Sequence, residues 1–143
     1  MMIRRSILCA ISALAFIISG NTAANQSRVM TDKGLEYIDL IVGNGAVAGL
    51  DSVVAIHVTG WLNDNGQKRS KFISSYDREK PVVFKVGTER VMKAWSMGVL
   101  GMQAGGKRRL FVPPDLGYGE KSVGKIVPPN AELIFDIELL EVK

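Results

Sequence analysis

The sequence predicts an α+β domain in which several antiparallel strands pack against one short helix. In most of the chain, apolar and polar residues alternate in short segments separated by turn residues, which is the pattern of half-buried strands. Between residues 88 and 102, apolar residues instead recur every three or four positions, as on one face of a helix. The length of 143 residues suits a single domain.

The clearest predicted strand covers residues 131–142. One face of this strand carries Leu133, Phe135, Ile137 and Leu139, and the other carries Glu132, Asp136 and Glu138. A polar outer face of this kind is typical of an antiparallel sheet. Further strands are predicted over residues 53–59, 81–86 and 107–112, with turns at 63–66, 113–114 and 128–130.

The predicted helix has one apolar stripe and plausible residues at both ends. The stripe consists of Val91, Trp95, Val99 and Met102. Thr88 is expected to cap the N-terminus, because its hydroxyl can accept a hydrogen bond from a free backbone N–H. Gly101 is expected to end the helix.

Residues 1–24 have the three-part plan of a secretory signal peptide. Arg4 and Arg5 precede the apolar run Ile7–Ile18, and small residues follow before Asn25. The run is too short for a permanent membrane anchor, which needs ~17–25 residues. We therefore expect a signal peptide at 1–24, a flexible tail at 25–33 and a folded domain at 34–143. The expected location is the periplasm in a Gram-negative cell, and otherwise the secreted fraction.

Removal of this leader changes the charge and the cysteine content. The net charge falls from +4 to +2, which argues against a nucleic-acid partner, and the basic triplet Lys107–Arg109 is predicted to be a solvated strand start. Cys9 is the only cysteine, so the mature chain would contain no disulfide, thiol nucleophile or cysteine metal site.

Two further motifs do not support catalysis by a cofactor or a nucleophile. Residues 101–107 match the start of the phosphate-binding pattern G-x-x-x-x-G-K-[ST], but Arg108 replaces the hydroxyl residue and the loop leads from a helix into a strand. His57 is the only histidine, and we interpret it as structural. No metal site or cofactor is expected.

A set of apolar and aromatic residues around two loops remains to be explained. Most of them suit an ordinary core. Tyr118 differs, because it lies in a glycine-flanked loop after Pro113–Pro114, where a buried strand residue is not expected. There it would offer a ligand an apolar ring and a hydroxyl.

Ten segments, in the same order, resemble the FKBP-type peptidyl-prolyl cis-trans isomerases, particularly small exported bacterial members. They are Gly34–Tyr37, Gly43–Gly45, Val58–Leu62, Phe72–Ser75, Val91–Trp95, Gly98–Met102, Gly105–Leu110, Pro113–Gly119, Ile126–Ala131 and Leu133–Leu140. The resemblance covers about residues 31–143, nearly the whole mature chain.

This resemblance implies a twisted antiparallel sheet of about five to six strands, wrapped around the helix, with a proline pocket between them. Trp95 would form the floor of the pocket, the Met92 backbone N–H would bind a substrate carbonyl and the Tyr118 hydroxyl would assist. The remaining implied site residues are Phe72 and Phe135, with Val58, Ile73, Val82, Val91, Ile126 and Val127 around the substrate. The implied partners are proline-containing unfolded or exported polypeptides and macrolide inhibitors, and the protein is expected to be a monomer.

The sequence departs from the family pattern at the edge of this pocket. Val58 replaces the usual tyrosine and Ile73 the usual aspartate, Val82 often aligns with an aromatic residue, and about four residues are added in 63–71. Because the tyrosine and aspartate are lost together, neither is left as a buried polar group without a partner. The loss removes the expected partner of Arg78 and predicts weakened macrolide affinity and altered isomerase activity.

Two functions fit the sequence. The first is a prolyl isomerase that assists the folding of exported proteins, a process in which uncatalysed isomerisation takes tens to hundreds of seconds. The second is a non-catalytic module or chaperone that binds proline-containing segments. We favour the first, because Trp95 and the Tyr118 loop are present and the chemistry requires no ionisable group.

Overall fold

The computed structural model describes residues 27–143. The predicted signal peptide and Cys9 lie outside the described residues. Within residues 27–143, no helix is long and apolar enough to span a membrane.

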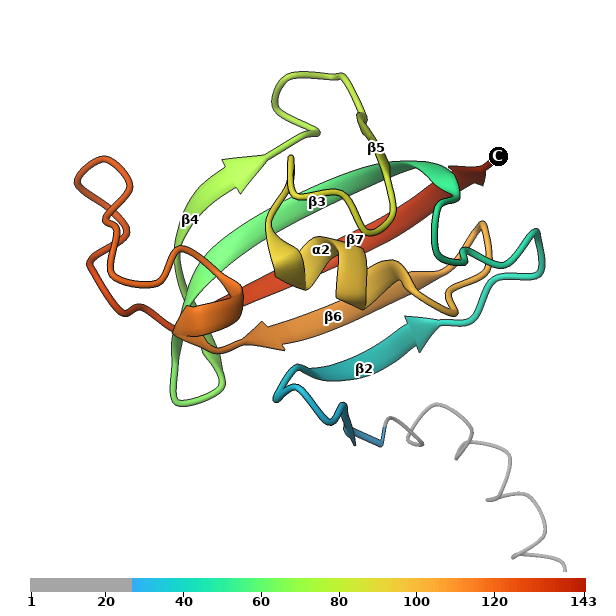
Figure 1. Ribbon diagram of the computed structural model, residues 1–143. Helices are drawn as coiled ribbons and strands as arrows, with labels where there is room; N and C mark the ends of the chain where they lie inside the picture. Colours follow the sequence, from blue (N-terminus) through green and yellow to red (C-terminus); the bar gives the residue numbers. More distant parts are fainter. Residues whose placement is uncertain (1–26) are drawn as a thin grey trace, which may run out of the picture.

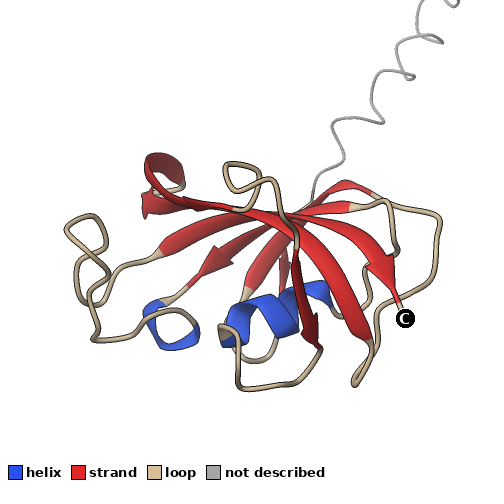
Figure 2. Cartoon of the chain, turned by 90° about the horizontal axis from the view of Figure 1, so that it is seen from above, coloured by secondary structure: helices blue, strands red, loops and turns tan. Residues whose placement is uncertain are grey.

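One antiparallel sheet of seven strands forms the framework (Figure 1), in the order β1-β2-β6-β7-β3-β4 with β5 paired to β3. The strands are β1 (Val29–Met30), β2 (Glu36–Ile41), β3 (Val53–Asp64), β4 (Gln67–Ser74), β5 (Val82–Lys85), β6 (Lys107–Val112) and β7 (Leu133–Val142). The short helices α2 (Lys93–Val99) and η2 (Pro114–Leu116, a 3-10 turn) lie on the same side of the curved sheet (Figure 2). The α+β prediction is therefore confirmed, with seven strands rather than five to six.

The additional strand, β1, lies within the predicted tail. Val29 is paired with Tyr37 of β2. The Arg28 guanidinium forms an ion pair with Glu36 at 3.1 Å and lies 3.9 Å from the centre of the Phe111 ring. Part of the segment 25–33 is thus held against the sheet by backbone pairing and by one arginine.

The helix is shorter than its apolar stripe predicted. It begins at Lys93 with Met92 as N-cap, and no side chain caps it. Thr88 instead accepts a hydrogen bond from the Arg90 N–H at 3.2 Å, in the turn before the helix, so the prediction that Thr88 is the cap is wrong. Gly101 follows the helix with φ of 82°, the left-handed conformation that commonly ends a helix.

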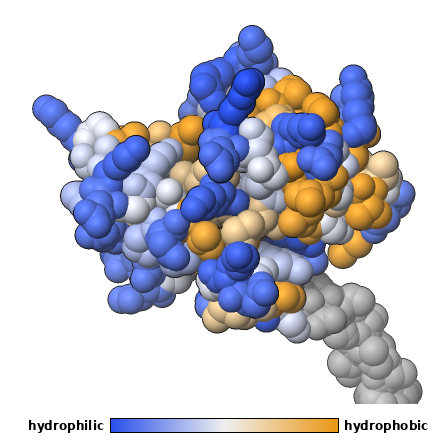
Figure 3. Space-filling model, viewed as in Figure 1, coloured by the Kyte–Doolittle hydropathy of each residue, from blue (hydrophilic) through white to orange (hydrophobic). Residues whose placement is uncertain are grey.

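The core lies between α2 and the inner face of the sheet. Fully buried side chains on that face include Leu133, Phe135, Ile137 and Leu139 of β7, as predicted. Ile134 is also buried, on the outer face, where its register partners are Trp61 and Phe111. The predicted polar outer face is therefore interrupted by one apolar row. Apolar surface also remains exposed on the side that carries α2 (Figure 3).

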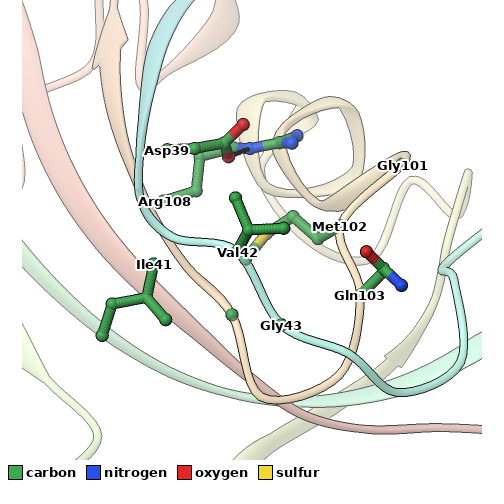
Figure 4. A pocket seen from close by; sticks show the side chains of 9 residues that line it. Asp39, Ile41, Val42, Gly43, Gly101, Met102, Gln103 and Arg108 are labelled. Atoms are coloured by element: carbon green, nitrogen blue, oxygen red, sulfur yellow. Dashed lines mark hydrogen bonds and ion pairs between the residues drawn. The ribbon is translucent and has the colours of Figure 1, made fainter. Parts of the chain in front are cut away.

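A buried arginine joins the end of α2 to the sheet. Arg108 donates from Nε to Asp39 at 2.6 Å and from one terminal nitrogen to the Gly98 and Leu100 carbonyls at 2.9 and 3.0 Å. Its guanidinium lies 4.0 Å from the centre of the Tyr37 ring, and Figure 4 shows it beside Asp39. The last carbonyls of a helix have no partner within the helix, and Arg108 supplies one. Because its side chain is only 7% exposed, the prediction of a solvated basic triplet is wrong for this residue.

Candidate functional site

Four aromatic rings from four parts of the chain form one continuous series between α2 and the sheet. Trp95 of α2 meets Phe135 of β7 with ring centres 5.7 Å apart and planes at 88°. Phe135 meets Phe72 of β4 at 5.7 Å and 78°, and Phe72 meets Tyr118 at 6.0 Å and 67°. Each pair has the edge-to-face geometry that aromatic rings favour. The structure thus brings together the four aromatic residues that the sequence singled out.

The first two rings of this series are more deeply buried than the last two. Phe135 is fully buried and Trp95 is 8% exposed, whereas Phe72 and Tyr118 are only partly buried. The first two rings therefore belong to the core and the last two approach solvent. This gradient gives the site an apolar floor and an aromatic rim.

The other predicted site residues belong to the hydrophobic core or pack against it, with one exception. Val58 and Val127 are buried in the same core. The partly buried residues packed against that core include Ile73, Val82, Val91 and Met92. Ile126 remains 45% exposed, and the structure does not place it in this packed set.

The polar groups at the site are hydrogen-bond donors. The Trp95 indole N–H is buried and has no partner among the described residues. Met92 is the N-cap residue of α2, and its carbonyl accepts a hydrogen bond from the Trp95 backbone N–H at 3.0 Å. The backbone N–H of Met92 itself has no partner within the helix. Burial raises the pKa of the Tyr118 phenol, so its hydroxyl stays protonated at neutral pH. A ligand with a carbonyl group could accept hydrogen bonds from donors of this kind.

His57 is held on the opposite face of β3. Its Nδ1 is 2.8 Å from Ser75 Oγ, which also accepts a hydrogen bond from the Val58 N–H at 2.8 Å. Its ring stacks on Tyr76 with centres 4.2 Å apart. These contacts support the interpretation of His57 as a structural residue. Among residues 27–143, no group of His, Cys, Asp or Glu is arranged to hold a metal ion.

Gly60 is a site residue to which the sequence analysis assigned no role. It pairs with Phe135 in the sheet, and a Cβ atom at this position would lie 2.6 Å from the Phe135 ring and 2.9 Å from Ile73. Only glycine therefore lets the Phe135 ring rest on β3. A glycine inside an otherwise regular strand is the signal that could have indicated this close approach.

The sequence pattern of FKBP-type peptidyl-prolyl cis-trans isomerases matches residues 45–140. The chain therefore belongs to this family and to this class of isomerase. Its relatives include an FK506-binding protein of Neisseria meningitidis serogroup B, which is 44% identical over 109 residues, or 76% of this chain and 96% of that protein. The peptidyl-prolyl cis-trans isomerase FPR2 of Saccharomyces cerevisiae is 47% identical over 90 residues, or 63% of this chain and 64% of that protein.

Solved structures agree with this assignment. AtFKBP13 has a TM-score of 0.71 and 34% identity, over 82% of this chain and 99% of that one. FkpA from Escherichia coli has a TM-score of 0.70 and 32% identity, over 92% of this chain but only 59% of that one. Some relatives are also longer, since the matched part is 42% of FK506-binding protein 2B of Rhizopus delemar.

Substitution of Gly60 tests the packing at the floor. We expect Gly60→Ala to lower the free energy of unfolding by about 1–3 kcal/mol, because the added methyl group collides with the Phe135 ring. The measurement is urea unfolding. Gly49→Ala is the matched control, since its Cβ would lie 3.9 Å from its nearest neighbour, Ser52 Oγ. Equal urea midpoints for Gly60→Ala and the wild type would contradict the proposed close packing.

Proposed function

We propose that the protein accelerates the isomerisation of X–Pro bonds in exported polypeptides, with the proline ring placed against Trp95. The observation that carries this proposal is the series of edge-to-face rings at an apolar floor, with donors and no acid, base or nucleophile among them. Such a surface fits a proline ring and an adjacent carbonyl.

An apolar pocket is sufficient for this reaction, because no covalent bond is made or broken. Rotation about the amide faces a barrier of ~18–20 kcal/mol, since the planar form is stabilised by resonance. The twisted amide has lost that resonance and is less polar. A pocket that excludes water therefore favours the twisted form, and fixed donors can hold its geometry.

The donors have distinct proposed roles. The Met92 N–H binds the substrate carbonyl and the Tyr118 hydroxyl assists at the rim. The Trp95 indole N–H is buried and has no partner among the described residues, so it is assigned no role in binding the substrate. Its burial without a partner carries a desolvation cost of ~1–3 kcal/mol.

The edge of the pocket is more apolar than the family pattern. Val58 is fully buried, and Ile73 packs beside the Phe135 floor at Gly60. Among the described residues, Arg78 forms no ion pair. We propose that macrolide inhibitors, which the family binds, bind this protein with reduced affinity.

The location of the protein is part of the proposal. The leader at residues 1–24, with Arg4, Arg5 and the run Ile7–Ile18, supports export and hence clients that fold outside the cytoplasm. The intact mass of the protein isolated from its own cells tests this, since we expect the chain to begin at Asn25. A chain that retains Met1 or Met2 in the cytoplasmic fraction would contradict export.

Matched tryptophan variants test the catalytic site. In a protease-coupled assay on X–Pro tetrapeptides, we expect Trp95→Leu to lower kcat/KM about tenfold or more, because the floor is lost; tenfold corresponds to ~1.4 kcal/mol. Tyr118→Phe should lower it about two- to tenfold, the effect of one hydrogen bond. Trp61→Leu, on the outer face, is the control and should leave kcat/KM unchanged.

Equal losses in Trp95→Leu and Trp61→Leu would refute catalysis at this site. If the wild type accelerates no tetrapeptide yet suppresses the aggregation of an unfolded protein, the protein is a binding module or chaperone instead.

Restoration of the family pattern tests the departures. We expect the double variant Val58→Tyr, Ile73→Asp to bind FK506 about tenfold more tightly than the wild type, since one hydrogen bond to a charged group contributes ~1.5 kcal/mol. Isothermal titration calorimetry measures the change. The single variant Val58→Tyr adds the tyrosine hydroxyl without the aspartate carboxylate, so its affinity for FK506 should increase less than that of the double variant. An unchanged dissociation constant in the double variant would show that these positions do not set inhibitor affinity.

A further inference from the structure

The loop at residues 87–92 leads from β5 into α2 (Figure 1) and carries two of the proposed site residues. Val91 is a predicted wall of the proline pocket, and Met92 is the proposed carbonyl-binding residue. Both side chains are only partly buried against the core. The proposed site therefore has two parts, the Trp95 floor on the helix and the Met92 N–H on the loop. Their relative position depends on how the loop is held.

Two hydrogen bonds hold the loop without reaching the helix. The Thr88 N–H donates to the Lys85 carbonyl of β5 at 3.1 Å. The Arg90 N–H donates to the Thr88 hydroxyl at 3.2 Å, within the loop itself. At the end of the loop, α2 begins without a side-chain cap. The first bond therefore ties the loop to the strand, the second shapes its turn, and neither fixes it to α2.

Ser96 of α2 supplies this connection. Its Oγ accepts a hydrogen bond from the Gly87 N–H at 3.1 Å. Gly87 stands at the start of the loop with φ of 98°, a left-handed conformation that favours glycine. Because Ser96 directly follows Trp95 in the helix, the bond relates the start of the loop to the residue that forms the floor of the site.

A serine is not the residue that helix stability alone would favour at this position. Ser96 is 7% exposed and lies in α2 among the buried residues Trp95, Gly98 and Val99. Serine forms helices less readily than alanine, and a buried hydroxyl is unfavourable unless it is hydrogen-bonded. Alanine would therefore suit the helix better. The bond to the Gly87 N–H accounts for the hydroxyl.

We propose that Ser96 is a positioning residue for the isomerisation, whose hydroxyl holds the loop so that the Met92 N–H keeps a fixed place relative to Trp95. The proposal rests on the proposed isomerase function. A donor that is already in place stabilises the twisted amide without reorganisation during the reaction. Without the hydroxyl the domain still folds, but the loop and its donor become more mobile and hold the substrate carbonyl less well.

A second serine provides a matched control. The Ser52 Oγ also accepts a hydrogen bond from a glycine N–H, that of Gly49, at 3.1 Å, and both bonds are partly buried. The segment from Gly49 to Ser52 carries no residue of the proposed site. Ser52→Ala and Ser96→Ala therefore remove equivalent hydrogen bonds, and only the second of these bonds connects to the site.

We expect Ser96→Ala in the full chain to lower kcat/KM for the tetrapeptide Ala-Leu-Pro-Phe about fivefold, the effect of one hydrogen bond, and Ser52→Ala to change it less than about twofold. The urea midpoints of the two variants should be similar. Ser96→Thr and Ser96→Val have the same shape and differ by the hydroxyl, so Ser96→Thr should retain about fivefold more kcat/KM than Ser96→Val.

The ¹⁵N relaxation of the free protein measures the loop without any activity. The Met92 amide should become more mobile in Ser96→Ala and Ser96→Val, and should keep its wild-type mobility in Ser96→Thr and Ser52→Ala. With an active wild type, unchanged kcat/KM in Ser96→Ala would overturn the proposal, whatever the mobility of Met92. Equal losses in Ser96→Thr and Ser96→Val would also overturn it.

The relaxation measurement separates this proposal from the proposed function. If the wild type isomerises no peptide but Met92 becomes mobile in Ser96→Ala, catalysis is refuted and the attachment of the loop by Ser96 is supported. If the wild type isomerises the tetrapeptide and Ser96→Ala changes neither kcat/KM nor the mobility of Met92, catalysis stands and the positioning role is refuted.

Discussion

The contact between the Phe135 ring and the backbone of β3 at Gly60 is the constraint on which the site depends. Because Gly60 has no side chain, the Phe135 ring can pack directly on the backbone of β3. A Cβ atom at position 60 would lie only 2.6 Å from this ring. From that position Phe135 meets Trp95 on one side and Phe72 on the other, each at 5.7 Å. A ring displaced by a methyl group could not keep both edge-to-face contacts, so the floor and the rim would separate.

The position of α2 is the second requirement, because the helix supplies Trp95. A helix of seven residues is too short to be stable by itself, and its ends need partners from elsewhere. The Arg108 guanidinium provides them at the C-terminal end, by hydrogen bonds to the Gly98 and Leu100 carbonyls and to Asp39. At the N-terminal end no side chain caps the helix, which leaves the Met92 N–H at the proposed site.

The sequence predicted those features that follow from local periodicity. The alternation in 131–142 identified the buried face of β7, and the stripe through Trp95 identified the helix. Features that depend on contacts between distant segments were missed. These are the two-residue pairing of β1, the burial of Ile134 between Trp61 and Phe111, and the burial of Arg108. The aromatic series was predicted only through the family resemblance, because no spacing brings Phe72, Trp95, Tyr118 and Phe135 together.

The account claims that a proline binds at the aromatic floor, and the indole N–H signals of the two tryptophans measure this most directly. In a ¹H–¹⁵N NMR titration with an Ala-Leu-Pro-Phe peptide, the Trp95 signal should shift progressively, because the proline ring would pack against the Trp95 ring. The Trp61 signal, from the outer face, should stay in place. A Trp95 signal that does not move at peptide concentrations where isomerisation is accelerated would contradict the claim that this pocket is the site.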